Sequence, residues 1–97
     1  MKFLLLSHHT GREVPENEKE ENIKAWGEWI KLLGTNTALP VHGGKTITSE
    51  SSQDYSGDVG GALIFEAASF EEAVEKAKKS PGLKYGWTHD ILQEMSM

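Results

Sequence analysis

Histidines and carboxylates are the residues of this 97-residue chain that are best suited to chemistry. His8 and His9 follow a short apolar run, and His89 and Asp90 stand together near the carboxyl end. Imidazole changes its charge near neutral pH and a carboxylate can orient it, so this combination suits general acid–base catalysis. The chain has no cysteine, which excludes thiolate metal sites, disulfides and a cysteine nucleophile. Any chemistry therefore uses oxygen and nitrogen groups.

The hydropathy pattern predicts the strands that must position these groups. Four segments are predicted to form strands: residues 2–7, 39–44, 59–67 and 88–95. The first and third of them carry bulky apolar side chains on successive positions, which is typical of burial on both faces. Residues 45–48 extend the second strand or form a separate extended piece. The polar, turn-rich stretch 49–58 is expected to be a mobile loop.

Two helices are predicted between these strands. Residues 15–33 carry acidic side chains at the amino end and then an apolar stripe. That stripe consists of Ile23, Trp26, Ile30 and Leu33, with Trp29 at its edge. The second helix begins at a capping box formed by Ser69 and Glu72, and Ser80-Pro81-Gly82 ends it.

This order of elements predicts a single α+β domain over residues 1–97 with a ferredoxin-like βαββαβ fold. Its four-stranded antiparallel sheet carries both helices on one face. Because the strands are apolar on both faces and no helix remains to cover the second one, we expect a second copy of the chain to cover it. The prediction is a homodimer, a dimeric α/β barrel, with a cleft between the two sheets.

Four segments of the sequence resemble a known family. They are KFLLLSHH at 2–9, AWGEWIKLLG at 25–34, GGKT at 43–46 and GGALIFEAASFEEAVEKAKKSPGL at 60–83. Together they are similar to the YCII-related (DGPF-domain) family of small dimeric α/β-barrel proteins. The resemblance implies the ferredoxin-like fold, the sheet-to-sheet dimer and a cleft, and a few members resemble dehydrochlorinase or isomerase-type enzymes.

Two departures from the family pattern concern its functional residues. The D-G-P-F motif is absent, and its nearest counterpart is the dissimilar Tyr55-Ser56-Gly57-Asp58. The histidine that some members carry on the first helix is also absent, because no histidine lies between Glu16 and Leu33. The catalytic assignment of those members therefore does not transfer to this chain.

The predicted sheet order 4-1-3-2 gathers the candidate site residues at one edge. We expect the first strand to run parallel to the third and antiparallel to the fourth, which brings the first strand's end toward Glu66. Adjacent residues of a strand point to opposite faces, so only one of His8 and His9, and one of His89 and Asp90, can face the cleft. We predict catalytic roles for His9, His89 and Asp90. Ligand-binding roles are predicted for His8, His42, Glu66, Trp87 and Arg12.

These residues leave several functions open. The leading prediction is a cleft that binds a small molecule and performs His/carboxylate acid–base chemistry. The alternatives are a non-catalytic interaction or accessory module, and a cofactor-independent monooxygenase-like activity. A metal site and a set of polar residues at solvated strand ends are further interpretations of the histidine cluster. We assign no metal ligand and no cofactor.

The charge and hydropathy of the chain argue against two classes of partner, nucleic acids and membranes. Fifteen acidic and ten basic side chains give a formal charge of −5, which disfavours nucleic-acid binding. The apolar run from Phe3 to Leu6 is far shorter than a membrane span and too short for a signal-peptide core. We therefore expect a cytoplasmic protein without a membrane partner.

Overall fold

The computed structural model describes residues 1–35 and 37–95 of the chain. The strands of the main sheet are β1 (Lys2–His8), β2 (Thr37–Pro40), β5 (Val59–Glu66) and β6 (Thr88–Gln93). The helices are α1 (Lys19–Leu33) and α2 (Phe70–Ala77), with short 3₁₀ helices η1 (Glu16–Glu18) and η2 (Pro81–Tyr85). A separate hairpin consists of β3 (Lys45–Ile47) and β4 (Ser52–Asp54).

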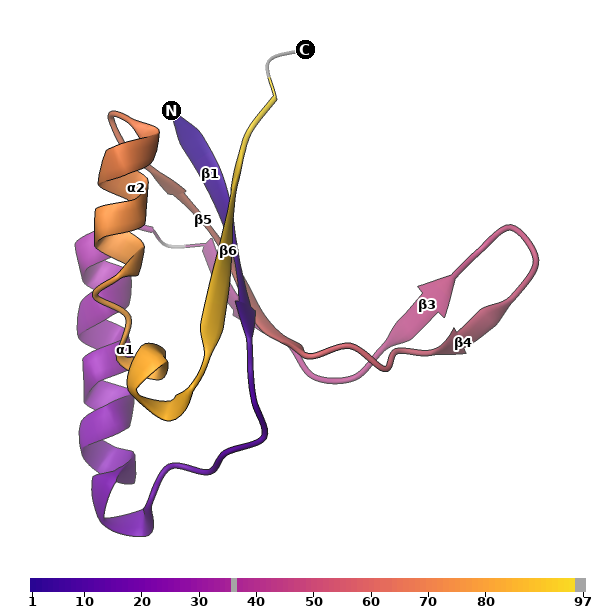
Figure 1. Ribbon diagram of the computed structural model, residues 1–97, viewed down its shortest axis with the longest axis horizontal. Helices are drawn as coiled ribbons and strands as arrows, with labels where there is room; N and C mark the ends of the chain where they lie inside the picture. The colour runs from indigo at the N-terminus through magenta and orange to yellow at the C-terminus, as the bar shows by residue number, and fades with distance from the viewer. Residues whose placement is uncertain (36, 96–97) are drawn as a thin grey trace.

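The main sheet has the strand order β2-β5-β1-β6, and every neighbouring pair is antiparallel. Both helices lie on one face of it (Figure 1). This is the predicted α+β, ferredoxin-like arrangement, with the β3–β4 hairpin inserted between the second and third strands of the sheet. Among the described residues, neither helix is long and apolar enough to cross a membrane.

One expectation about this sheet is wrong. β1 and β5 are antiparallel, with Lys2 opposite Glu66 and His8 opposite Val59. The first helix returns the chain so that β2 is parallel to β1, and β5 lies between them, antiparallel to both. Glu66 therefore lies at the opposite end of β1 from His8, and it belongs to no cluster with the histidines.

The core lies between the helices and one face of the sheet. Phe3 and Leu5 of β1 are 1% and 0% exposed there, and Trp29 of α1 is 3% exposed. The predicted stripe of α1 is wrong at two positions, because Trp29 is central rather than peripheral and Ile23 is 72% exposed. Its remaining members are buried or packed against the core: Trp26, Ile30 and Leu33.

The predicted Ser69 cap at the start of the second helix is confirmed, whereas α1 begins at Lys19, after η1, rather than at residue 15. Ser69 Oγ accepts the backbone N–H of Glu72 at 3.1 Å, and a Glu72 carboxylate oxygen accepts the N–H of Ala68 at 3.2 Å. The first bond satisfies a donor that the first turn of α2 leaves without a helical partner, and the second fixes the residue just before the N-cap. At the end of α1, Gly34 adopts a left-handed φ of 73°, which favours glycine.

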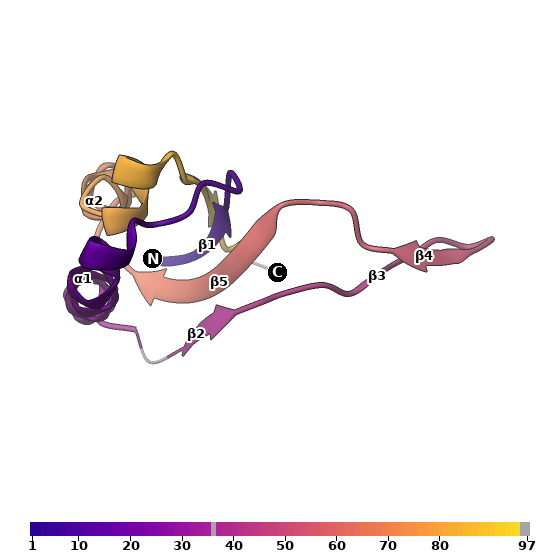
Figure 2. The same ribbon diagram turned by 90° about the horizontal axis from the view of Figure 1, so that it is seen from below.

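The β3–β4 hairpin projects away from the main sheet (Figures 1 and 2). The strand predicted over 39–44 ends at Pro40, and part of the loop predicted over 49–58 forms β4. All residues of both hairpin strands are exposed, including Ile47. A two-stranded hairpin of this kind is marginally stable when nothing covers it.

The helix-free face of the sheet is apolar over its centre. Leu4 and Leu6 of β1 alternate with the core residues and are half-buried. Beside them on this face, Ile64 is 41% exposed and Leu92 is 49% exposed. In the single chain this face is therefore open to solvent.

Candidate functional site

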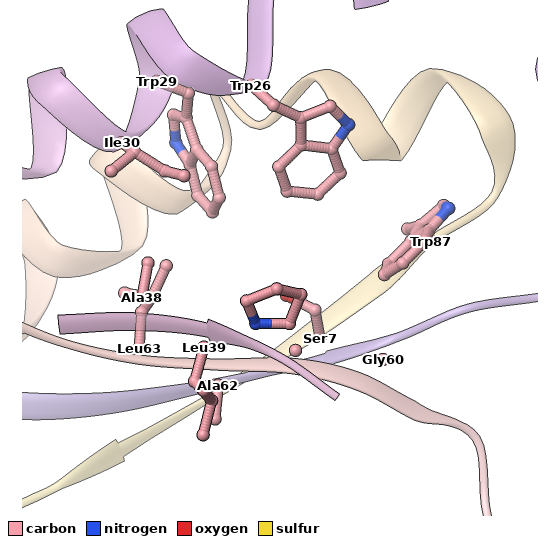
Figure 3. A pocket seen from close by; sticks show the side chains of 12 residues that line it. Ser7, Trp26, Trp29, Ile30, Ala38, Leu39, Gly60, Ala62, Leu63 and Trp87 are labelled. Atoms are coloured by element: carbon pink, nitrogen blue, oxygen red, sulfur yellow. The ribbon is translucent and has the colours of Figure 1, made fainter. Parts of the chain in front are cut away.

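An aromatic cavity of about 320 Å³ lies between α1 and the β2–β5 side of the sheet (Figure 3). Trp26 and Trp29 cover it from the helix, and Trp87 closes one side of it. The sheet side is formed mainly by small or aliphatic residues: Ala38, Leu39, Pro40, Gly60, Gly61, Ala62 and Leu63. Ile30 and Ser7 complete the lining, and Ser7 supplies a hydroxyl in these surroundings.

The three tryptophan rings pack edge to face. The centroid of Trp26 lies 5.5 Å from that of Trp29 and 5.5 Å from that of Trp87. Two glycines allow this packing: a Cβ on Gly82 would lie 2.7 Å from the Trp26 ring, and one on Gly60 would lie 3.1 Å from the Trp87 ring. The sequence thus keeps side chains out of the places that the rings occupy.

The loop before β6 is fixed by contacts with the start of α1. Glu18 accepts hydrogen bonds from the Tyr85 hydroxyl at 2.9 Å and from Lys84 Nζ at 3.0 Å. The bond with Lys84, followed by that with Tyr85, lowers the pKa of Glu18. Because η2 ends at Tyr85, these contacts also hold the backbone that carries Trp87.

His89 lies on the helix side of the sheet between two buried serines. Its Nδ1 is 2.9 Å from Ser7 Oγ, and its Nε2 is 2.7 Å from Ser80 Oγ. Its ring stacks on Trp29, with a centroid separation of 5.3 Å and an interplanar angle of 22°. Burial lowers the pKa of His89, and the nearby charge of His8 lowers it further. The environment of His89 therefore favours the neutral imidazole.

His8 lies on the opposite face and is held by two carboxylates. Its Nδ1 is 2.7 Å from Asp58 Oδ1, and its Nε2 is 2.7 Å from Asp90 Oδ2. These bonds, the one with Asp58 first, raise the pKa of His8, and the bond with His8 lowers the pKa of Asp58. With both ring nitrogens bonded to carboxylates, the protonated form of His8 is favoured, and this form has no free nitrogen that could accept a proton.

A register irregularity between Ser7 and His8 brings Asp58 to this position. The shift places His8 opposite Val59, the first residue of β5, so the preceding Asp58 lies beside the imidazole. The backbone N–H of His9 also bonds to Asp58 O at 3.0 Å. Asp58 was missed in the sequence because the third strand was expected to be parallel to β1. Antiparallel pairing would have placed residues 58 and 59 beside His8.

The residues predicted as catalytic do not converge. His89 faces the helix side and Asp90 bonds to His8 on the other side. His9 is exposed, with its ring 5.9 Å from the Trp87 ring. Strand alternation separates His89 from Asp90, and the end of β1 carries His9 out of the sheet.

The residues predicted to bind a ligand are also dispersed. Trp87 lines the cavity and His8 lies in the carboxylate cluster on the other face. Arg12 lies in the loop after β1, near Gly86, and His42 is exposed in the loop after β2. Three cavity residues that carry polar or aromatic groups were assigned no ligand role from the sequence: Ser7, Trp26 and Trp29. The signal for Ser7 is the strand alternation that sends it, like Leu5, to the helix face, and the signal for Trp26 and Trp29 is their spacing of three residues on one helix.

Within residues 1–35 and 37–95, no group of three or more histidine, aspartate or glutamate side chains has the geometry of a metal site. The cluster of His8, Asp58 and Asp90 is a set of hydrogen bonds in which both imidazole nitrogens are engaged. The geometry offers hydrogen bonding and aromatic stacking in the cavity. On the opposite face it offers the two hydrogen bonds of His8 with Asp58 and Asp90.

No protein-family model matches the chain, and no curated protein matches it. Among solved structures, it is similar to 5-chloro-2-hydroxyhydroquinone dehydrochlorinase (TftG) from Burkholderia phenoliruptrix AC1100, determined in complex with 2,5-dihydroxybenzoquinone. The match has 21% sequence identity and a TM-score of 0.53, and it covers 98% of this chain and 94% of that one. This likeness supports the fold, and the structural neighbour is an enzyme.

Proposed function

We propose that this protein is a YCII-like homodimer that binds a small, planar ring compound in the cavity beneath Trp26. The observation that carries the proposal is the tryptophan-lined cavity of about 320 Å³. Small-molecule sites are typically concave and mostly apolar, with a few polar groups that fix the ligand's orientation. Flat tryptophan surfaces favour offset or edge-to-face contact with another ring.

The size and lining of the cavity favour a ligand with one ring. A volume near 320 Å³ lies at the lower end of the range for small-molecule sites. The neighbouring enzyme was determined in complex with 2,5-dihydroxybenzoquinone, a compound with one ring. An oxygen-substituted six-membered ring is therefore the ligand class that we propose.

Nuclear magnetic resonance of the tryptophan indole N–H groups tests this proposal. Addition of 2,5-dihydroxybenzoquinone should shift the signals of Trp26 and Trp87 with a saturable dependence on concentration. Ile30→Phe adds a ring at the cavity wall and should weaken binding at least about tenfold. Ile23→Phe makes the same change on the same helix, at a residue that is 72% exposed, and should bind normally. Failure of quinones and phenols to shift either signal at millimolar concentration would overturn the proposal.

The proposed dimer forms through the helix-free face of the sheet. Its central side chains are apolar, and exposed Ile64 and Leu92 continue the surface. The hairpin that projects from the sheet would also gain a covering partner in such a dimer (Figure 2). A contiguous apolar surface of this kind marks an interaction site.

Sedimentation equilibrium at micromolar protein tests the dimer. The wild-type chain should sediment as a dimer, and Ile64→Lys should give a folded monomer because it places a charge in the contact. Ile23→Lys on α1 is the control and should remain dimeric. A wild-type monomer at these concentrations would disprove this part of the proposal, whether or not the ring compound binds.

One observation favours a second candidate, the non-catalytic module. Both nitrogens of His8 are bound by carboxylates, so the one His/carboxylate cluster described above has no free base. As a non-catalytic module, the protein would bind its ligand without transforming it. Incubation with a chlorinated hydroxyhydroquinone and measurement of released chloride separate the two: release would favour an enzyme, and tight binding without release would favour the module.

A further inference from the structure

We infer that Ser7, His89 and Ser80 form a directed hydrogen-bond relay that presents the Ser7 hydroxyl proton to an acceptor oxygen of a ligand in the cavity. This inference rests on the proposed ring-binding function and specifies its ligand further. It predicts selection for rings that carry a carbonyl or phenolate oxygen. The direction of each bond follows from counting the protons of the three side chains.

The relay begins at η2. Ser80 Oγ accepts the backbone N–H of Gly82 at 3.2 Å, and the same oxygen lies 2.7 Å from His89 Nε2. Ser80 and Ser7 are equally buried, at 6% and 5% exposed, but Ser7 lines the cavity, where an occupant can accept its proton, and Ser80 does not. The proton of Ser80 therefore needs a partner inside the protein. Among the hydrogen bonds of the described residues, the acceptor available to it is His89 Nε2. Ser80 therefore donates its proton to Nε2.

The tautomer of His89 follows from this bond. A neutral imidazole has one N–H, and a nitrogen that accepts a hydrogen bond carries no proton. Burial keeps this imidazole neutral, because it lowers its pKa. With Nε2 accepting from Ser80, the proton lies on Nδ1, 2.9 Å from Ser7 Oγ. His89 therefore donates to Ser7.

The last proton of the relay is that of Ser7. Ser7 is 5% exposed and lines the cavity on the side of the sheet, opposite Trp26 (Figure 3). Since its oxygen already accepts from His89, its O–H is left to point at a cavity occupant. The other side chains on the sheet side of the lining are apolar, so this hydroxyl is the polar side-chain group there that can orient an oxygen substituent.

The packing around His89 holds this orientation. Trp29 stacks on the imidazole, and the Trp29 indole N–H donates to Lys76 O of α2 at 2.9 Å. The ring of His89 therefore cannot turn over without displacing Trp29 or breaking both serine bonds. The donor that reaches the cavity is organised before a ligand enters, which reduces the ordering cost of binding.

The tautomer can be tested in the free protein, without a ligand. Long-range ¹H–¹⁵N correlation spectra should show the proton of His89 on Nδ1 and an unprotonated Nε2. Ser80→Ala removes the donor to Nε2 and should shift His89 toward the opposite tautomer or a mixture. Ser49→Ala, in the exposed turn of the hairpin, should leave the spectrum of His89 unchanged. A proton on Nε2 in the wild-type protein would overturn the inference.

A pair of ligands separates this inference from the proposed function. Wild-type protein should bind both 2,5-dihydroxybenzoquinone and p-xylene, a ring of similar shape without oxygen. Ser7→Ala should weaken the quinone about three- to tenfold, the loss of one hydrogen bond, and leave p-xylene unchanged. Equal quinone affinity in Ser7→Ala and wild type would overturn the relay while the ring site stands. If the wild-type protein binds neither ring, the proposed function itself fails.

Discussion

The two faces of the main sheet each hold one histidine, and they hold it in opposite ways. On the helix side, His89 lies between two serine hydroxyls and beneath Trp29. On the helix-free side, His8 lies between two aspartates. Ser7, which bonds to His89, and His8, which bonds to the aspartates, are adjacent in β1. The two environments are therefore only one residue apart along the strand.

This difference shows that the partners of a histidine, and not its residue type, determine its chemistry. Burial disfavours the charged form of His89, whereas the hydrogen bonds with Asp58 and Asp90 favour the charged form of His8. The charge of His8 also lowers the pKa of His89 across the sheet. The helix side thus offers uncharged hydrogen-bonding groups next to the cavity, and the helix-free side holds the charged groups of the His8 cluster.

The largest expected effect is a loss of stability when a side chain is truncated on the helix side of the sheet rather than on the helix-free side. Leu5→Ala removes a side chain that is 0% exposed on the helix side and should lower the free energy of unfolding by about 2–5 kcal/mol. Leu92→Ala acts on a side chain that is 49% exposed on the other side and should cost less than about 1 kcal/mol in the monomer.

Urea unfolding of both variants at two protein concentrations checks this prediction. In a dimer, stability depends on protein concentration, so the loss from Leu92→Ala should grow as the protein concentration rises. The loss from removing the Leu5 side chain should be similar at both concentrations. Losses of equal size that do not depend on concentration would contradict the proposed contrast between the faces.

The fold was largely predictable from the sequence, because local patterns determine most of it. The doubly apolar runs of the first and third strands and the Ser69 cap are short-range signals, and both correspond to features of the structure. The β3–β4 hairpin was predicted only in part: residues 45–48 were expected to be extended, as β3 is, but β4 was assigned to a loop. Its short strands are fully exposed and carry little hydropathy pattern.

The candidate site was less predictable, because it depends on pairing between distant strands. The assumption that β5 runs parallel to β1 placed Glu66 beside the histidines, where the antiparallel register places Asp58. Alternation predicted that His89 and Asp90 face opposite sides, but not which side each faces. Only the complete packing places Ser80, at the start of η2, against His89.

The second prediction concerns the pH dependence of stability. The pKa of His89 is near 6.5 in the unfolded chain and lower in the folded protein. His89 therefore makes the free energy of unfolding fall as the pH decreases below about 6.5. The folded pKa of His8 is higher than 6.5, so its contribution is lost as pH rises above that value and through the folded pKa. These two residues together favour greatest stability near pH 6.5.

Urea unfolding between pH 5.5 and 8.5 measures both slopes. His89→Gln should reduce the loss of unfolding free energy below pH 6.5 and leave the loss above pH 6.5 unchanged. His8→Gln should do the reverse. The change at half-buried His89 should be the larger one, because solvent screens the His8 cluster, whose aspartates are 61% and 64% exposed. An acidic slope that persists in His89→Gln would show that this imidazole is not held neutral.

The smallest expected effect is a redistribution of charge within the His8 cluster. Asp58→Asn should lower the pKa of His8 more than Asp90→Asn does, because the bond with Asp58 makes the largest contribution to the raised pKa. Asp54→Asn, whose carboxylate binds Lys45 in the hairpin, is the control and should leave the His8 titration unchanged. Titration of the His8 ring by nuclear magnetic resonance measures each pKa directly.

The same titration decides whether the helix-free face can perform acid–base chemistry. If neither aspartate substitution lowers the pKa of His8, the two carboxylates do not hold the proton, and a nitrogen of His8 is free to act as a base. If both substitutions lower it, His8 is an ionic connection between the start of β5 and β6, and catalysis must come from another group. Under that outcome the cavity and its Ser7 hydroxyl are the remaining place, among the residues discussed, where a ligand meets a polar group.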